Sequence, residues 1–136
     1  MMEASAKEYT LDQPFKLFYF PVESRAGAIR LMLAHGNVQY EDCRITIEEW
    51  GKGELKPHMP NGQMPALMWE DGHVMGESLE IAITIAKHCG YYQGEEDLAF
   101  AKSMWAQMSK WYAIIFMPTD FDTQLKEVLE LTVPEF

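Results

Sequence analysis

The stretch QMPALMWEDGHVMGESLEIAITIAKH, residues 63–88, places a proline before an apolar run, then a tight turn, then a helical pattern. An Asp-Gly pair at positions 71–72 separates the runs PALMWE and HVMG, which is typical of a β-hairpin. Residues 78–90 predict a helix with Ser78 as its N-cap, apolar on nearly every side and therefore buried. Pro65 cannot donate a backbone hydrogen bond, and on spacing alone a trans proline at a sheet edge explains it.

A strand–helix–strand pattern precedes this stretch. FKLFYF, residues 15–20, predicts a buried strand rich in aromatic side chains. SRAGAIRLMLAHG, residues 24–36, predicts a helix that Ser24 can cap and Gly36 can terminate. VQYEDCRI, residues 38–45, predicts a second strand. Strand, helix and strand at this spacing form a βαβ unit with parallel strands and a right-handed crossover.

Together, the two patterns predict an α/β domain over residues 14–90. Its order is β-α-β, then an irregular link, then β-β-α. The glycines and prolines of the link, residues 48–63, forbid a long helix. This order is typical of a thioredoxin-like sheet with helices packed on it, and a polar tail, residues 1–13, precedes the domain.

The remainder of the chain, residues 98–136, predicts an incomplete all-helical domain, joined to the first by a linker over residues 91–97. LAFAKSMWAQMSKWYAIIFM, residues 98–117, is one long helical pattern. Pro118 ends it, and DTQLKEVLELTVPEF, residues 122–136, starts another helix. Two helices do not make a core by themselves, so we expect them to pack on the first domain, on a partner or on further chain.

Charge and cysteine content argue against several function classes. A formal net charge of −10 disfavours nucleic acid and anionic membranes as partners, because phosphate groups are bound by clustered Lys and Arg. Cys43 and Cys89 form no CxxC motif and no cluster with histidine, so we expect no metal site and no disulfide scaffold. The longest apolar stretch, residues 111–118, is shorter than the ~20 residues that span a membrane. The N-terminus carries no secretion signal, which predicts a cytoplasmic protein.

A family resemblance follows from these residues. The succession KLFYF, SRAGAIRLMLAHGNVQYEDCRI, a tryptophan, GQMPAL, DG and ESLEIAITIA resembles the glutathione-binding domain of cytosolic glutathione transferases. It is most similar to the sigma-like class, to which the S-crystallins are related, strongly over residues 15–90 and weakly over residues 95–133. The resemblance implies glutathione as co-substrate, a small hydrophobic electrophile as its partner in the reaction, and a homodimer or other oligomer.

The same resemblance implies that Tyr19 and Arg25 are catalytic. In the family, the tyrosine hydroxyl donates a hydrogen bond to the glutathione sulfur, and a hydrogen bond to the thiolate lowers the thiol pKa. Arg25 matches an arginine that lies near the sulfur and supports the tyrosine. From the residues alone, Tyr19 is better explained as one more aromatic side chain of a strand, and Arg25 as a surface arginine.

Most glutathione-binding residues are implied in the same way. Pro65 matches a cis proline, so that Met64 presents its backbone to the cysteinyl unit of glutathione as an added strand would. Gln63 matches the residue before it, and Glu77 and Ser78 match the pair that holds the γ-glutamyl end. The free N–H groups of a helix N-terminus do attract a carboxylate, although an N-cap beside an acid requires no ligand.

Trp50 and a lysine are implied to bind the glycine end of glutathione. Trp50 matches the tryptophan whose indole N–H reaches that end of the tripeptide. Lys52 and Lys56 are both candidates for the family's basic residue there, and from the sequence either one pairs with the glycyl carboxylate or is solvated.

Two departures from the family concern the helical domain. Many members carry an acid on the first helix of this domain, whereas this chain has none between Leu98 and Met117. Members also continue through several more helices, so the resemblance implies a C-terminally shortened domain. The apolar residues of the helix form a hydrophobic substrate wall, a core stripe or an oligomer interface: Met104, Trp105, Met108 and Trp111.

The function implied is that of a glutathione transferase in detoxification, which conjugates glutathione thiolate to small hydrophobic electrophiles or performs a glutathione-dependent isomerisation. A non-catalytic, transferase-like structural or assembly protein is the alternative, favoured by the missing acid and opposed by Tyr19 and Arg25. A thiol–disulfide oxidoreductase is excluded, because the first strand–helix junction, YFPVESRAG, contains no cysteine to attack a disulfide.

Overall fold

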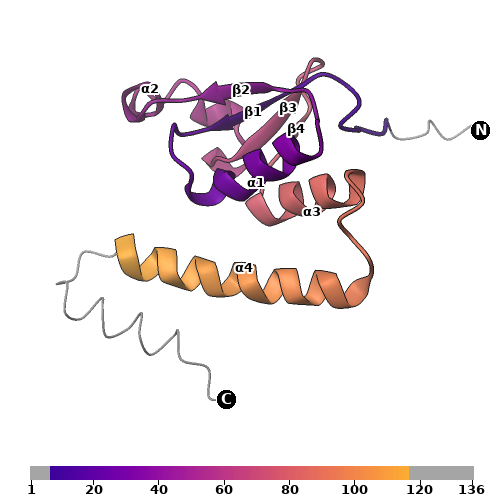
Figure 1. Ribbon diagram of the computed structural model, residues 1–136. Helices are drawn as coiled ribbons and strands as arrows, with labels where there is room; N and C mark the ends of the chain where they lie inside the picture. Colours follow the sequence, from indigo (N-terminus) through magenta and orange to yellow (C-terminus); the bar gives the residue numbers. More distant parts are fainter. Residues whose placement is uncertain (1–6, 117–136) are drawn as a thin grey trace, which may run out of the picture. The chain divides into compact units, whose positions relative to one another are not determined.

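The computed structural model describes residues 7–116, which divide into one unit up to Tyr92 and a second from Gln93 (Figure 1). The first unit has the order strand–helix–strand, a link of short helical turns, and strand–strand–helix. Its elements are β1 (Phe15–Tyr19), α1 (Ser24–His35), β2 (Glu41–Arg44), α2 (Ile47–Gly51), η1 (Lys56–His58), η2 (Pro60–Gly62), β3 (Ala66–Trp69), β4 (Val74–Met75) and α3 (Ser78–His88). The predicted thioredoxin-like α/β fold is confirmed.

Four strands form one mixed sheet in the order β2-β1-β3-β4. β1 pairs parallel with β2 and antiparallel with β3, with Phe18 opposite Ala66. The hairpin of β3 and β4 turns at the predicted Asp-Gly pair, where Gly72 has a φ of 88° that favours glycine. β2 is shorter than predicted, because Val38 and Tyr40 pack against the core before the strand begins.

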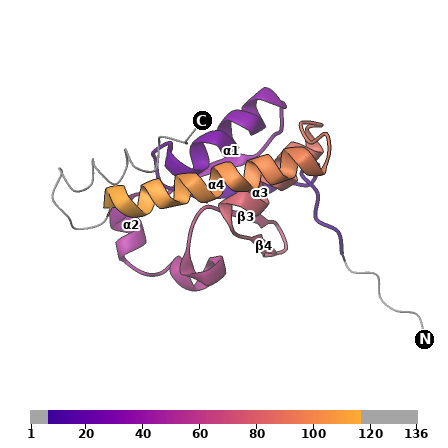
Figure 2. The same ribbon diagram turned by 90° about the horizontal axis from the view of Figure 1, so that it is seen from below.

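The hydrophobic core of the first unit lies between the sheet and the pair α1 and α3, which lie side by side (Figures 1 and 2). Along β1, buried residues alternate with residues that are more exposed, as the period of a strand requires. Each fully buried leucine or isoleucine contributes about 1.5–3 kcal/mol. The buried core residues are Leu11, Phe15, Leu17, Ile29, Leu33, Leu67, Trp69, Ile81 and Ile85.

Two of the predicted helix caps are wrong. Glu23 and Glu77 occupy the N-cap positions of α1 and α3, and neither helix has a side-chain capping hydrogen bond at that position. Ser24 and Ser78 are instead the first residues of their helices, because the chain enters each helix one residue earlier than predicted. In the irregular link, the capping box of Thr46 and Glu49 supports the short helix α2.

Residues 7–13 form an ordered arm on the β3–β4 hairpin, although they belong to the predicted N-terminal tail. The Asp71 carboxylate accepts hydrogen bonds from the Lys7 ammonium at 2.5 Å and the Tyr9 hydroxyl at 2.8 Å. The Tyr9 ring stacks on His73 with centroids 3.7 Å apart. Leu11 is buried in the core. The arm is therefore part of the folded domain.

The arm lies at the opposite end of the sheet from α2 in both views (Figures 1 and 2). Its backbone is tied to β3, because the indole N–H of Trp69 donates to the Thr10 carbonyl at 3.0 Å. The two ends of the sheet therefore carry different structures: the arm and hairpin at one end, and the loops around α2 at the other.

In the second unit, the described part is one helix, α4 (Glu95–Phe116). The predicted long helix is confirmed and begins three residues earlier than predicted, since Gln93 N–H donates to the Asp97 carboxylate and acids fill the first turn. The helix predicted after Pro118 lies outside the described residues. No helix in the described part of the chain is long and apolar enough to cross a membrane.

Replacing Asp71 by asparagine is expected to lower the melting temperature at neutral pH. Hydrogen bonds from Lys7, the His73 N–H and Tyr9 hold the pKa of Asp71 well below its usual range. A lowered folded-state pKa stabilises the protein above the unfolded pKa of about 4 and loses that contribution in more acidic solution. The difference in melting temperature between wild type and variant should therefore shrink as the pH falls below about 4.

The matched control is Glu70→Gln, which removes the neighbouring exposed carboxylate. Thermal unfolding of both variants between neutral and strongly acidic pH checks the prediction. An equal effect of the two substitutions, or a difference for Asp71→Asn that does not depend on pH, would contradict it.

Candidate functional site

A cavity of about 390 Å³ lies where β1 ends, where α1 and α3 begin, and beside α2 and η2. It brings together all of the predicted glutathione-site residues except the two candidate lysines, Lys52 and Lys56. The cavity is lined by Tyr19, Phe20, Arg25, Trp50, Pro60, Gly62, Gln63, Met64, Pro65, Glu77 and Ser78.

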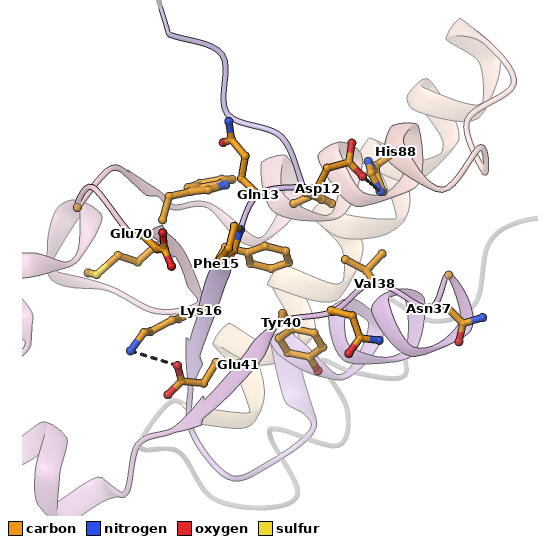
Figure 3. Close-up of a pocket in the computed structure, with 17 residues that line it drawn as sticks. Asp12, Gln13, Phe15, Lys16, Asn37, Val38, Tyr40, Glu41, Glu70 and His88 are labelled. Carbon is orange, nitrogen blue, oxygen red and sulfur yellow. Dashed lines mark ion pairs between the residues drawn. The ribbon is translucent and has the colours of Figure 1, made fainter.

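A larger cavity of about 740 Å³ lies beside the N-terminal arm and contains none of the predicted site residues (Figure 3). Four of its charged side chains form two ion pairs: Lys16 with Glu41 at 3.2 Å and His88 with Asp12 at 3.8 Å. Phe15 fills the interior, buried and close to Tyr40 (Figure 3). We therefore place the candidate site in the smaller cavity, because the predicted site residues line it and line no part of the larger one.

The Met64–Pro65 peptide bond at the cavity is cis, as the family resemblance implies. β3 begins directly after it, at Ala66, so Pro65 takes no place in the ladder of the sheet. Within the described chain, no hydrogen bond joins the Met64 backbone N–H or C=O to another residue. Buried or half-buried backbone groups are nearly always paired, so these two groups are available to a ligand.

Tyr19 is the last residue of β1 and is only 6% exposed. Its carbonyl accepts a hydrogen bond from the Ile45 N–H at 2.8 Å, which fixes the end of the strand. Among the described residues, its hydroxyl has no hydrogen-bond partner in the protein. Arg25, half-buried in the first turn of α1, lines the same cavity.

Trp50 and Lys56 lie together at the side of the cavity. The Trp50 ring meets Phe20 edge to face, with centroids 5.9 Å apart. The Lys56 ammonium lies 5.4 Å from the centre of the Trp50 ring, although Lys56 does not line the cavity. Of the two lysines that the sequence left open, Lys56 is the one beside the tryptophan.

The start of α3 presents Glu77 and Ser78 in an unusual backbone conformation. Glu77 has a φ of 62°, which costs a residue other than glycine about 1–3 kcal/mol. Its carbonyl still accepts the first helical hydrogen bond, from the Ile81 N–H at 3.0 Å. Ser78 is buried, and the positive end of the helix dipole at its N-terminus favours an anion. Residues in such strained conformations cluster at ligand sites.

Sequence reasoning missed Arg30, which is 7% exposed on the core side of α1. Its guanidinium reaches back to the loop that follows Tyr19, donating to the carbonyls of Phe20 and Val22. The spacing in the sequence was a signal of this contact. Arg30 lies four positions after Ala26 and therefore on the same, buried face of the helix.

The predicted hydrophobic wall lies in the second unit, on α4. Met104, Trp105 and Met108 are part of this helix, and the side chain of Trp111 lies outside the described residues. Among the described residues, no group of three or more His, Cys, Asp or Glu side chains is arranged to hold a metal ion.

Residues 25–88 match the family described as "Glutathione S-transferase, N-terminal domain". The chain belongs to the cytosolic glutathione S-transferase family. Glutathione S-transferase 4 of Caenorhabditis elegans is 42% identical over 91 residues, which are 66% of this chain and 42% of the relative. Glutathione S-transferase S1 of Drosophila melanogaster is 45% identical over 76 residues, 56% of this chain and 29% of the relative, in keeping with the predicted sigma-like class.

A solved structure of the family is also similar to this chain. The crystal structure of a nematode-specific glutathione S-transferase from C. elegans superposes with a TM-score of 0.72 at 28% identity, covering 87% of this chain and 62% of that one. The chain therefore spans less than half the length of the two curated relatives and about three fifths of this solved structure.

Gly76→Ala is expected to disturb the cavity from outside it. A Cβ at this position would lie 2.6 Å from the Cβ of Pro60, a rigid ring in η2 that cannot turn aside. The clash should move η2 and the adjoining Glu77, and destabilise the domain by about 1–3 kcal/mol. Urea unfolding measures the free energy of unfolding, and calorimetric titration measures the affinity of the protein for glutathione.

Gly51→Ala is the matched control, because a Cβ on Gly51 meets nothing within 4 Å. It changes a glycine of the same region without a clash. The prediction is contradicted if Gly76→Ala has the same stability and the same glutathione affinity as Gly51→Ala. In that case the position of η2 does not depend on the close approach of Gly76 to Pro60.

Proposed function

We propose that this protein binds glutathione in the smaller cavity and transfers its thiolate to a small hydrophobic electrophile. The observation that carries the proposal is the convergence of three features in one cavity: the Tyr19 hydroxyl, the unpaired Met64 backbone at a cis proline, and the N-terminus of α3. The names of its relatives, which are glutathione S-transferases, support the same reaction.

Glutathione fits this cavity as an extended tripeptide. Its cysteinyl N–H and C=O pair with the Met64 backbone, which acts as a strand edge. The γ-glutamyl carboxylate lies at the N–H groups of α3 beside Ser78, where the helix dipole favours negative charge. Glu77 accepts hydrogen bonds from the α-ammonium, and Gln63 lies next to the same end.

The glycyl end points toward α2 and η1. There the indole N–H of Trp50 donates to the glycine, and the Lys56 ammonium beside the ring supplies the charge that attracts the glycyl carboxylate. This orientation leaves the cysteinyl side chain at Tyr19, at the end of β1.

Tyr19 then activates the sulfur. A hydrogen bond from its hydroxyl stabilises the thiolate over the thiol, whose pKa is ordinarily about 8.5, so that a lowering by about two pKa units makes thiolate predominant at neutral pH. The thiol proton passes to solvent, the thiolate attacks the electrophilic carbon, a C–S bond forms and the leaving group departs. The cationic side chain of Arg25 in the same cavity favours the anionic sulfur.

The second substrate and the assembly of the protein belong to the same proposal. The hydrophobic substrate wall on α4 stays a prediction, as does isomerisation in place of conjugation where the substrate carries no leaving group. We also propose that the protein forms a homodimer or other oligomer and acts in the cytoplasm in detoxification, a proposal supported by the family likeness. Exposed Phe100 and Met104 on α4 support an apolar contact surface.

A non-catalytic glutathione-binding or structural protein is the second candidate. The observation that favours it is the absence of any acid between Leu98 and Met117 in α4. All of the proposed glutathione contacts lie in the first unit, so glutathione binding does not require turnover.

Tyr19→Phe is expected to keep glutathione affinity within a few-fold and to lower turnover about a hundredfold, because only the donor to the sulfur is lost. Calorimetric titration with glutathione and a conjugation assay with an aromatic chloronitro electrophile measure the two effects. Tyr40→Phe is the matched control, since Tyr40 is a half-buried tyrosine at the other cavity.

Three outcomes separate the candidates. Absence of glutathione binding to the wild-type protein overturns the proposed site. Binding without turnover supports the non-catalytic candidate. Turnover that survives Tyr19→Phe overturns the role of the tyrosine in thiol activation.

Glu77→Gln is expected to weaken glutathione binding about ten- to a hundredfold, because a hydrogen bond to a charged group is lost at the α-ammonium. Glu80→Gln is the control: Glu80 is an exposed acid in the first turn of the same helix, outside the cavity. Dissociation constants from calorimetry check the prediction, and equal affinities of the two variants would refute this use of Glu77.

A further inference from the structure

Arg30 is a charged side chain on the otherwise apolar core face of α1. Its side chain is 8% exposed and makes three hydrogen bonds. Nη1 donates to the Val22 carbonyl at 2.8 Å, Nη2 donates to the Phe20 carbonyl at 3.1 Å, and Nε donates to the Asp42 carboxylate at 3.2 Å. A buried charge persists when it is paired and hydrogen-bonded, and Arg30 meets both conditions.

Two of these bonds hold the loop that joins β1 to α1. This loop runs from Phe20 to Glu23, with Tyr19 directly before it and Arg25 directly after the start of the helix. The carbonyls of Phe20 and Val22 lie outside both the sheet ladder and the helix. Arg30 therefore pairs two backbone carbonyls of this loop.

The guanidinium also lies against the Tyr19 ring. Its carbon Cζ is 5.9 Å from the ring centroid, within the distance at which a cation is attracted to an aromatic face. The Nε of the guanidinium is held by Asp42 of β2, whose second oxygen accepts a hydrogen bond from Arg44 at 2.9 Å. One planar group thus connects β2, the loop and the ring of Tyr19.

We propose that Arg30 is a positioning residue that sets the orientation of the Tyr19 hydroxyl in the cavity. The proposal rests on the proposed function, in which Tyr19 activates the glutathione sulfur. Arg30 lines no part of the cavity and touches no substrate. It acts by fixing the backbone after Tyr19 and the ring itself, and a displacement of about 1 Å at a reacting group is enough to lower turnover about a hundredfold.

Arginine is required here because of its shape. The three acceptors lie around one planar fork, which donates from three nitrogens at fixed angles. A lysine carries the same charge as a single point and cannot reach the two loop carbonyls and Asp42 together. Arg30→Lys therefore preserves the positive charge and removes most of the hydrogen bonds that hold the loop after Tyr19.

The first test needs no glutathione and observes Tyr19 directly. Nuclear magnetic resonance of protein labelled in its tyrosine rings identifies the Tyr19 signals as those missing in Tyr19→Phe. We expect Arg30→Met and Arg30→Lys to shift or broaden these signals. Lys16→Met, which removes a cation paired with the Glu41 carboxylate of β2 outside the loop, is expected to leave them unchanged. Tyr19 signals that are identical in wild type and both Arg30 variants overturn the proposal.

The second test is a double-mutant cycle on thiolate formation. The absorbance of bound glutathione thiolate and kcat are measured for wild type, Arg30→Lys, Tyr19→Phe and the double variant. We expect Arg30→Lys to lower the thiolate absorbance and kcat about tenfold or more, because the Tyr19 hydroxyl loses its orientation. The dissociation constant of glutathione should change less than about threefold. In the Tyr19→Phe background, Arg30→Lys should have no further effect.

The two failures are distinguishable. Equal effects of Arg30→Lys with and without the Tyr19 hydroxyl overturn the positioning role and leave the proposed function intact. Wild-type protein that binds no glutathione overturns the proposed function, while the tyrosine signals still decide whether Arg30 orients Tyr19. If Arg30→Met does not fold, Arg30→Lys carries both tests.

Discussion

The structure depends on the pairing of β1 with a neighbour on each side. Parallel pairing with β2 places the end of β1 beside Arg44, and antiparallel pairing with β3 places it beside the cis proline. Tyr19 thus meets Met64 and Pro65 only because β3 starts where β1 ends. An all-parallel sheet would put the beginning of β3 at the other end of Tyr19's strand, and the cavity would lose one of its walls.

The smaller cavity is built from the least regular parts of the domain. Its residues come from a strand end, a cis peptide, a 3₁₀ turn and a helix start with Glu77 at positive φ. Such segments leave backbone N–H and C=O groups without internal partners, whereas regular elements use theirs internally. The packed core of β1, β3, α1 and α3 holds these segments in place, so the backbone strain at Glu77 persists where a ligand can use it.

Much of the fold followed from local patterns in the sequence. The βαβ unit, the Asp-Gly hairpin and the helices α1, α3 and α4 were predictable because strand and helix periods are properties of short segments. The helix caps were not, since Ser24 and Ser78 lie one residue inside helices whose entry depends on tertiary packing. The ordered arm was also missed, because its contact to Asp71 joins residues more than sixty positions apart.

The site divides in the same way. By itself, the sequence determined which residue types lie at the ends of which elements, and by family resemblance it pointed to Tyr19, Pro65 and Glu77. Only the tertiary structure decided that these residues share one cavity, that Lys56 lies beside Trp50, and that Arg30 turns inward to the loop after Tyr19. The physical reason is that a periodic pattern specifies which face of an element is buried, whereas the partners of a buried charge are set by whatever strands and loops the fold brings to that face.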